Sequence, residues 1–430
     1  MKDDRDDDTL LDTLQWETFE YFRREINPRN GLIADKSRKG WPASIAATGL
    51  ALAAYPVGVE RGFMPRGEAV AITLTTLRFL RDAEQSTAAD ATGYKGFYYH
   101  FLDMESGRRA WQCELSTVDS TFLFAGALSA AAYFDRDDDD ERQVRALADE
   151  LYRRADWRWA QNKKATVTHG YKPKHGFLRY RWEGFDEALL LYVLGLGSPT
   201  YPLTDDSYDA WLSTYSWNDI YGYEFVYAGP LFIHQLSHVW IDFRGIQDAY
   251  MRARGMDYFE NSRRATHVQR EYAIRNPLQF AHYSKLCWGL TACDGPGPAT
   301  IKVNGVDRTF FDYLARGAPY GPDDGTIAPW AVVASLPFAP EIVMPAIRYF
   351  HDVELKQADS YGFKATFNPT YPVKDGNPNG WISPWNFGLN QGPIVLMIEN
   401  HRTGLLWKLM RGCPYIVRGL RRAGFTGGWL

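Results

Sequence analysis

The chain has 430 residues, of which 45% are hydrophobic and 23% are charged, and its formal net charge at pH 7 is −4. This composition is ordinary for a soluble globular protein, and the small net charge gives no indication of a nucleic-acid or membrane partner. Aromatic residues make up 15% of the chain, with 15 Trp and 26 Tyr. These flat side chains suit a large core and stacking against sugar rings equally well.

Cysteine content and the N-terminal segment bear on the cellular compartment. The 4 cysteines form no C-x-x-C pair, so neither a disulfide framework nor a zinc knuckle is predicted. Residues 1–8 are acidic and contain no apolar segment, so no signal peptide is predicted. The sequence as written therefore indicates the cytoplasm, and a trimmed chain would leave the periplasm or secretion open. No apolar stretch reaches the roughly 20 residues of a membrane helix.

Helical periodicity begins near the N-terminus. Thr9 is expected to cap a first helix whose apolar face runs from Trp16 to Ile26 at spacings of three and four. A helix of small residues is predicted over Ala43–Tyr55 and is expected to end at Pro56. The apolar spacing over 70–77 predicts a third helix.

The next helices alternate between buried and half-exposed types. Asp119–Phe134 is almost wholly apolar, and a helix that is apolar on every side belongs in the interior. Asp135–Arg154 begins with an acidic run and continues as an amphipathic helix. This alternation is predicted to continue to the C-terminus. The later helices are predicted over Asp186–Leu196, Asp206–Tyr215, Leu231–Arg254, Tyr258–Tyr272, Ala328–Leu336, Pro340–Phe350 and Gly392–Met410.

Strand patterns are scarce and short, at Gly96–Leu102, Thr300–Val303 and Arg308–Phe311. No Pro- or Ser-rich linker divides the chain. About a dozen helices in inner and outer layers predict an all-α toroid or a solenoid, with residues 1–430 as one domain. Five long loops rich in Gly, Pro, Trp and acids are expected at the ends of the inner helices, where they would form a substrate cleft. These loops span Gly31–Pro42, Gly93–Glu114, Thr166–Glu183, Cys293–Thr326 and Thr366–Gln391.

Carboxylates stand where loops enter apolar helices. Glu114 and Asp119 flank the start of the most apolar helix, 186–187 opens another, and 323–324 precedes a Gly-Thr-Ile-Ala-Pro segment. Glycoside hydrolysis needs two carboxyl groups, one protonated and one ionised. An acid at a helix N-terminus is stabilised as the anion, which favours a base or a plain cap. For Glu187 to act as the proton donor, burial has to raise its pKa.

The segment LFIHQLSHVWIDFRG gives a different possibility. On a helix, His234, His238 and Asp242 would share one face at i, i+4 and i+8, which suits a metal ion. The Glu of an H-E-x-x-H motif is missing, and the same face could equally hydrogen-bond sugar hydroxyls or buried backbone. Arg263 lies in DYFENSRRAT, which reads as a salt-bridged surface or as part of the same polar network.

Several long motifs resemble one known family. They are ELSTVDSTFLFAGAL, FDEALLLYVLGLGSPTYPL, GPLFIHQLSHVWIDFRGI, DYFENSRRAT, YSKLCWGLTACDGP, DDGTIAPWAVVASLPFAPE and GLNQGPIVLMIENHRTGLLW. Together they resemble the glycoamylase-type family that contains the bacterial endo-β-1,2-glucanases (glycoside hydrolase family 144 and relatives). The resemblance extends from about Leu14 to Leu409 in the same order.

This resemblance implies an (α/α)6 toroid, an anomer-inverting or related mechanism, no metal or other cofactor, and β-1,2-glucan (sophoran) or a related β-glucan as substrate. A Glu followed by Ala, matching Glu187, implies the proton donor, and Asp119 matches a family acid. Asn390 departs from the pattern, in which Asp is expected at this position. The base is then expected to be Glu114 or Asp119, acting on water directly or through a substrate hydroxyl.

The predicted site therefore combines three catalytic carboxylates with a larger set of substrate-binding residues. We expect the tryptophans of the long loops to stack on sugar rings, and the histidines and arginines to fix sugar hydroxyls or the inner-helix network. The predicted catalytic residues are Glu187, Asp119 and Glu114. The predicted substrate-binding residues are Trp41, Trp111, Trp182, Asp186, His234, His238, Asp242, Arg244, Arg263, Asp324, Trp381, Trp385 and Asn390.

Three alternatives stay open. The protein could be a transglycosylase or an exo-acting enzyme on the same glucan. It could bind glucan without cutting it, if Asn390 has replaced an essential base. A metal-dependent hydrolase is the third alternative. In each case the partner is an oligo- or polysaccharide, without nucleic acid or membrane.

Overall fold

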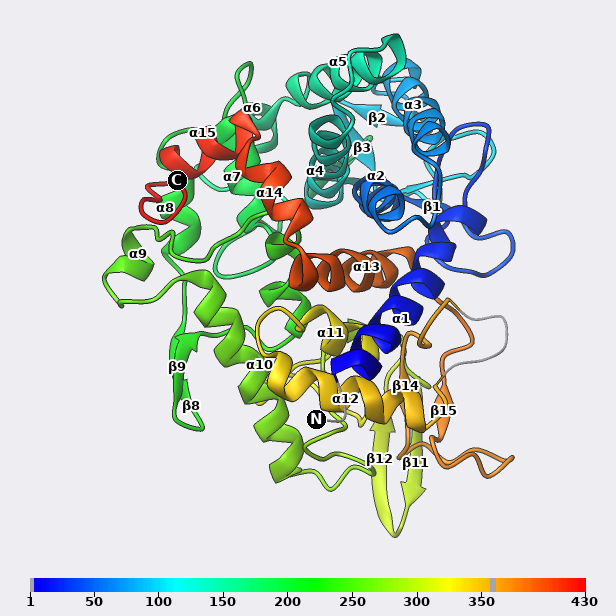
Figure 1. Ribbon diagram of the computed structural model, residues 1–430. Coiled ribbons are helices and arrows are strands. Elements are labelled where there is room, and N and C mark those ends of the chain that lie inside the picture. The colour runs from blue at the N-terminus through cyan, green and yellow to red at the C-terminus, as the bar shows by residue number, and fades with distance from the viewer. Residues whose placement is uncertain (1–3, 356–360) are drawn as a thin grey trace.

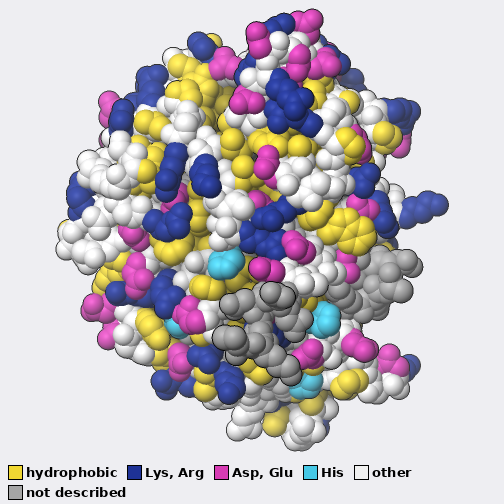
Figure 2. All heavy atoms as spheres, viewed as in Figure 1, with side chains coloured by type: hydrophobic (Ala, Val, Ile, Leu, Met, Phe, Trp, Pro, Cys, Tyr) yellow, Lys and Arg dark blue, Asp and Glu magenta, His cyan; other side chains and the backbone are white. Residues whose placement is uncertain are grey.

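The computed structural model describes residues 4–355 and 361–430, and most of its regular structure is helical (Figure 1). Residues 1–3 of the acidic N-terminal segment lie outside the described residues. Within the described ranges, no helix is long and apolar enough to cross a membrane. On the face drawn in Figure 2, basic and acidic side chains are interspersed.

Two buried helices, α2 (Ile45–Glu60) and α4 (Thr117–Tyr133), pack against each other in the main hydrophobic core. They approach so closely because glycines meet at the contact: a Cβ on Gly126 would lie 1.8 Å from the carbonyl oxygen of Gly49. Helix α4 confirms the buried helix predicted over Asp119–Phe134.

The prediction that the preceding helix ends at Pro56 is wrong, because α2 continues to Glu60 with Pro56 inside it. A proline in a helix removes one backbone hydrogen bond and crowds the previous turn. Here every residue from Ile45 to Gly58 is buried, and this packing outweighs the local cost.

Half-exposed helices cover the buried ones. Helix α3 (Arg66–Asp82) packs against α5 (Asp139–Arg153), and α1 (Asp4–Arg24) packs against α13 (Gly388–Arg402). The first helix begins at Asp4, ahead of the expected cap at Thr9. The remaining helices are α6 (Trp157–Ala160), α7 (Leu189–Gly197), α8 (Ser207–Leu212), α9 (Ala249–Arg252), α10 (Tyr258–Arg275), α11 (Pro329–Ala334), α12 (Pro340–Asp352), α14 (Leu405–Arg411) and α15 (Pro414–Arg422).

The helix predicted over Leu231–Arg254 is wrong. This segment forms two short 3-10 helices, η1 (Leu231–His234) and η2 (Leu236–Val239), and then runs without regular structure to α9. Hydrogen bonds to distant segments replace the helical ladder: the side-chain amide of Gln235, for instance, donates to Ser335 Oγ at 2.7 Å. Tertiary partners of this kind are invisible to local periodicity.

Two other helix boundaries differ from the prediction. The helix predicted over Gly392–Met410 is divided into α13 and α14 at Gly404, whose φ of +66° is unfavourable for other residues. Helix α7 starts at Leu189 rather than Asp186, because the Asp186 carboxylate accepts a hydrogen bond from the Ala188 amide at 3.0 Å and holds a turn before the helix.

The strands are short and lie in the loops between helices. The predicted strands at 300–303 and 308–311 form one hairpin, which projects from the molecule in Figure 1. A five-stranded sheet, in the order β2-β3-β5-β6-β7, leads directly into α4. Its strands are β2 (Gly93–Tyr94), β3 (Phe97–Tyr99), β5 (Leu115–Ser116), β6 (Gly170–Lys172) and β7 (Gly176–Phe177). Smaller sheets pair β1 (Ala43–Ser44) with β4 (Phe101–Leu102), β8 (Trp217–Ile220) with β9 (Tyr223–Val226), β10 (Ala292–Cys293) with β13 (Leu314–Ala315), β11 (Ala299–Val303) with β12 (Val306–Phe310), and β14 (Phe367–Asn368) with β15 (Trp381–Ile382).

Candidate active site

A cavity of about 570 Å³ opens where the long loops meet the N-terminal ends of α4 and α13. Each of the five long loops identified in the sequence contributes lining residues. The contributions are Asp35, Lys36 and Trp41; His100, Phe101, Trp111 and Glu114; His169, Leu178 and Trp182; Cys293, Asp294 and Tyr313; and Phe387, Leu389 and Asn390. The loops therefore form the cleft that their position in the sequence predicts.

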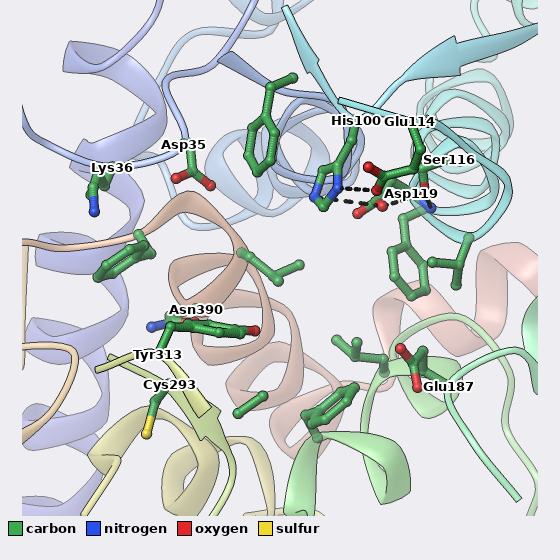
Figure 3. Close-up of a pocket in the computed structure, with 18 of the residues that line it drawn as sticks. Asp35, Lys36, His100, Glu114, Ser116, Asp119, Glu187, Cys293, Tyr313 and Asn390 are labelled. Carbon is green, nitrogen blue, oxygen red and sulfur yellow. Dashed lines mark hydrogen bonds and ion pairs between the residues drawn. The ribbon is translucent and has the colours of Figure 1, made fainter. Parts of the chain in front are cut away.

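All three predicted catalytic carboxylates line this cavity. Glu187 lies across it from Glu114 and Asp119 (Figure 3). Ser116 is the N-cap of α4, since its Oγ accepts a hydrogen bond from the Asp119 amide at 3.2 Å. The Asp119 carboxylate is thus not the N-cap of α4, so the alternative that Asp119 serves only as a helix cap is wrong.

Glu187 has an environment suited to a proton donor. Burial in the cavity wall raises its pKa, and the negative charges of Asp186 and Asp119 raise it further. Asp186 does not line the cavity: its Oδ1 accepts hydrogen bonds from the Ala188 amide at 3.0 Å and from the Trp211 indole at 3.1 Å. A carboxyl group kept protonated near neutral pH can act as a general acid.

His100, which sequence reasoning missed, contacts both of the other carboxylates. Its Nδ1 lies 2.8 Å from Glu114 Oε1, and its Nε2 lies 3.6 Å from Asp119 Oδ2. Burial opposes a charge on this imidazole, but Asp119, Glu114 and Asp35 together raise its pKa to about 9. Burial also works against ionisation of Glu114, and the hydrogen bond and charge of His100 nevertheless lower the pKa of Glu114 to about 2.

Sequence reasoning also missed Asp35 and Lys36, two charged residues on the cavity wall. Burial raises the pKa of Asp35 to about 6, although His100 and the Trp41 indole, which donates to Asp35 Oδ2 at 3.1 Å, both oppose this. The Lys36 ammonium lies 4.1 Å from the centre of the Trp41 ring and 3.9 Å from Asp294 Oδ2. These residues lie in predicted loops, but no motif marks them individually.

Three of the five predicted tryptophans line the cavity. Trp41 and Trp111 meet edge to face with ring centres 4.8 Å apart, and Trp182 stacks on His169 at 3.9 Å. Trp111 is 55% exposed, and its backbone has a φ of 52°, a conformation that non-glycine residues rarely adopt. A strained backbone that presents an exposed ring at a cavity is typical of a binding site.

The other two predicted tryptophans, Trp381 and Trp385, do not line the cavity. Trp385 lies near Trp41 of the cavity lining, because the Arg38 guanidinium is 5.8 Å from the Trp385 ring and 4.8 Å from the Trp41 ring. Asn390 lines the cavity at the start of α13.

The predicted His-His-Asp face does not exist. His234 bonds to the Ala228 carbonyl at 3.1 Å, and His238 bonds to Ser262 Oγ at 3.0 Å. Burial lowers the pKa of His234 to about 4 and that of His238 to about 3. Neither histidine lines the cavity, and no three His, Cys, Asp or Glu side chains in the described ranges are grouped to hold a metal ion.

The remaining predicted binding residues are engaged in ion pairs outside the cavity. Asp242 pairs with Arg244 at 2.7 Å and with Arg411, and Arg263 pairs with Glu341 at 2.7 Å. Of the two roles predicted for them, fixing sugar hydroxyls or the inner network, these ion pairs fit the second, since a paired charge is already satisfied within the fold.

Asp324 likewise lies outside the cavity, in a fully buried ion pair with Arg316 at 2.7 Å. Arg316 also donates to the carbonyls of Cys293 at 2.7 Å and Phe311 at 3.1 Å. The ion pair therefore fixes the loop that carries Tyr313. The Tyr313 side chain is 64% exposed and lines the cavity.

Comparison with known proteins places these observations in a family. A family model described as "Putative glucoamylase" matches residues 179–414, more than half of the chain. A Bacteroides uniformis protein, whose crystal structure is described as a "putative glucoamylase", is 33% identical, with 99% of this chain and 98% of that chain covered and a TM-score of 0.86. An endo-β-1,2-glucanase from Chitinophaga pinensis, solved with sophorotriose and glucose, is 26% identical, with 99% of each chain covered and a TM-score of 0.85.

A curated relative extends the comparison. An exo β-1,2-glucooligosaccharide sophorohydrolase (non-reducing end) from Parabacteroides distasonis is 28% identical over 452 residues, which cover 97% of this chain. This chain spans 58% of the length of that relative. On the family match and on the Bacteroides uniformis relative, which is similar over almost its whole length, the chain belongs to the Glycoamylase family of "Putative glucoamylase" proteins.

Proposed function

We propose that this protein is a glycoside hydrolase that cleaves β-1,2-glucan or a related β-glucan, with no metal or other cofactor. One observation carries the proposal: Glu187, whose pKa is raised, faces the ionised Glu114 and the carboxylate of Asp119 across one cavity. Acid and base on opposite sides of a cavity are what glycoside hydrolysis requires. The names of the Chitinophaga pinensis and Parabacteroides distasonis relatives support the choice of glucan.

In the proposed reaction, Glu187 gives its proton to the glycosidic oxygen as the bond to the anomeric carbon breaks. Water attacks that carbon from the opposite face and loses a proton to Asp119 or Glu114, directly or through a substrate hydroxyl. One water is consumed, and the sugar is released with inverted configuration. Asn390 cannot take this proton, because an amide is a very weak base. We assign it to hydrogen bonding with sugar hydroxyls.

We further propose that residues 1–430 form one catalytic domain, an (α/α)6 toroid with its long loops at one end. The pairing of buried with half-exposed helices supports this, as in α2 with α3 and α13 with α1. Trp41, Trp111 and Trp182 would stack on sugar rings, with Trp41 and Trp111 forming one wall.

An exo-acting enzyme on the same glucan is the second candidate, because the Parabacteroides distasonis relative is named as one. The product pattern separates the two. An endo-acting enzyme releases a ladder of oligosaccharides early in the reaction, whereas an exo-acting enzyme releases one short product from the start.

The test is incubation of the purified protein with linear β-1,2-glucan, with and without EDTA. Glu187→Gln removes the proton donor and is expected to abolish sugar release, by at least about a hundredfold. Glu183→Gln is the matched control: Glu183 is an exposed acid on the same loop that accepts a hydrogen bond from Thr166 Oγ1 at 2.8 Å, outside the cavity.

Release that survives EDTA, persists in Glu183→Gln and disappears in Glu187→Gln supports the proposal, and the anomer first formed reports the stereochemistry. If no sugar is released while glucan still raises the melting temperature, the protein binds glucan without cutting it. Activity that depends on a metal would favour the metal-dependent alternative.

A further inference from the structure

His100 lies between Glu114 and Asp119, the two candidates for the general base. Besides its ring contacts with Glu114 and Asp119, its ring stacks on Phe101 with centres 4.0 Å apart. Its backbone amide donates to the Glu114 carbonyl at 2.9 Å, and its carbonyl accepts from the Ile45 amide at 3.1 Å. The imidazole is therefore held on both sides of its ring and by its own backbone (Figure 3).

The charges around His100 favour its cationic form. Three carboxylates act on it, from three different segments: Asp35 before α2, Glu114 before β5 and Asp119 in α4. Two cations act on these carboxylates: Lys172 of β6 acts on Glu114, and Lys36 acts on Asp35. Three negative charges around one imidazole outweigh the loss of solvent on burial.

The two carboxylates that flank the ring differ in how strongly they are engaged. Glu114 makes a short hydrogen bond with Nδ1, and its lowered pKa makes it a weak base. Asp119 lies farther from the ring, at 3.6 Å, which is too long for a hydrogen bond but close enough for attraction between charges. Both the His100 and Ser116 contacts fall on Asp119 Oδ2, which leaves Oδ1 to accept a proton.

We propose that His100 is a positioning residue: held as an imidazolium between Glu114 and Asp119, it attracts the Asp119 carboxylate, orients it as the base and is itself anchored by Glu114. This inference rests on the proposed function and chooses between the two bases left open there. The positive charge of His100 lies on the wall that carries the base, Asp119. The protonated Glu187 on the opposite wall is the acid. His100 itself neither gives nor takes the proton of the reaction.

Two neutral variants separate charge from shape. In His100→Asn the amide nitrogen can take the place of Nδ1 and keep the contact with Glu114, whereas in His100→Gln it can reach toward Asp119 as Nε2 does. Neither carries the charge. We expect both to lower kcat on β-1,2-glucan at least tenfold with KM within about twofold.

The pH profile distinguishes an electrostatic role from mere structural support. A positive charge beside the base opposes its protonation, so without the charge of His100 the acidic limb of kcat/KM should move to higher pH by about one unit in both variants. A residue that only supports the fold would lower activity without moving this limb. An unmoved limb in well-folded variants, judged by circular dichroism and melting, overturns the proposal.

A second measurement needs no substrate. In protein labelled with ¹³C and ¹⁵N histidine, the His100 resonances, assigned with His100→Asn, should titrate near pH 9 and shift to lower pH in Asp119→Asn and in Glu114→Gln. His282 is the internal control, because it lies outside the cavity and burial alone lowers its pKa, so it should titrate at the same pH in all three proteins.

Glucan cleavage and the titration of His100 distinguish a failure of the proposed function from a failure of the role of His100. If the glucan is not cleaved and His100 still titrates as expected, the proposed function fails and the charge cluster stands. If the glucan is cleaved but His100 titrates at an ordinary value near 6.5, the role of His100 is overturned.

Discussion

Asp186 and Glu187 show how a neighbouring charge can control a proton donor. Both hydrogen bonds to Asp186 fall on Oδ1, from the Ala188 amide and the Trp211 indole. Two donors on one carboxylate favour its ionised form, whereas burial favours the protonated form of both acids. For Asp186 burial outweighs the two donors and raises its pKa, but at alkaline pH, where Asp186 is ionised, its charge raises the pKa of Glu187 and helps to keep the donor protonated.

Asp186→Asn is therefore expected to lower the upper pH limit of activity. An asparagine keeps Oδ1 as an acceptor for both hydrogen bonds but removes the charge, so the pKa of Glu187 falls. A general acid is lost as the pH rises through its pKa, and the alkaline limb of kcat/KM should move down by about one unit. The measurement is kcat/KM on β-1,2-glucan between pH 5 and pH 9. An unchanged or raised limb would refute this role.

At this scale, sequence reasoning found the carboxylates because they stand where loops enter apolar helices. Glu114, Asp119 and Glu187 were identified in this way, with the family resemblance as support. His100 and Asp35 were missed because a lone histidine between two short strands and an acid in a loop have no periodicity or spacing to mark them. The pairing of β1 with β4 brings the segments next to these two residues together.

The contact between α2 and α4 governs the position of the base at the scale of elements, because Asp119 lies in the first turn of α4. The helices meet at Gly49 and Gly126, with no room for a side chain between the backbones. Close contact of this kind transmits any added volume to both helices, since protein interiors are densely packed.

Gly126→Ala is expected to destabilise the protein strongly. The new Cβ would lie 1.8 Å from the Gly49 carbonyl oxygen, which is backbone and cannot rotate away. The cost should be about 3 kcal/mol or more, because overpacking here forces the helices apart. Urea denaturation measures it.

The matched control is Gly67→Ala in α3, where nothing lies within 4 Å of the added Cβ. It should leave stability unchanged or raise it by about 0.5–1 kcal/mol, since alanine is the better helix former. Equal changes in the free energy of unfolding for Gly126→Ala and Gly67→Ala would show that α2 and α4 can move apart without loss of stability.

Helices with an apolar face were predictable, and segments held by distant partners were not. Asp119–Phe134 packs as its composition requires, and its neighbour over 139–153 is amphipathic as its pattern indicates. In 231–254, by contrast, the side chains of Gln235 and His238 bond to segments far along the chain, and these bonds decide the local backbone. Periodicity carries no information about such partners.

For the whole molecule, mostly helical structure and family membership could be predicted, because they follow from patterns spread over the entire chain that single tertiary contacts do not alter.

The stability of the molecule in acid depends instead on buried titratable groups that the sequence does not reveal. His234 and His238 are buried and neutral in the folded state. Their folded pKa values, about 4 and about 3, lie below the ordinary 6.5.

We expect these histidines to weaken the fold as the pH falls below 6.5. In that range the unfolded chain binds protons that the folded chain does not, so each histidine lowers the free energy of unfolding by about 1.4 kcal/mol per pH unit until its folded pKa is reached. Asp35, Asp186 and Glu187, whose pKa values are raised, act in the opposite direction over part of this range. The comparison must therefore be between variant and wild type.

His238→Gln removes one of the two titrations. The amide can still bond to Ser262, so the variant should fold, although lost packing against Phe243 and Phe338 lowers its stability at pH 7. Its free energy of unfolding, from urea denaturation between pH 4 and pH 6.5, should fall less steeply with acid than that of the wild type. His351→Asn, at an exposed position, should leave the wild-type slope intact. Parallel slopes for His238→Gln and wild type would mean that His238 is already protonated in the folded protein, although its burial outweighs the attraction of the Asp242 charge.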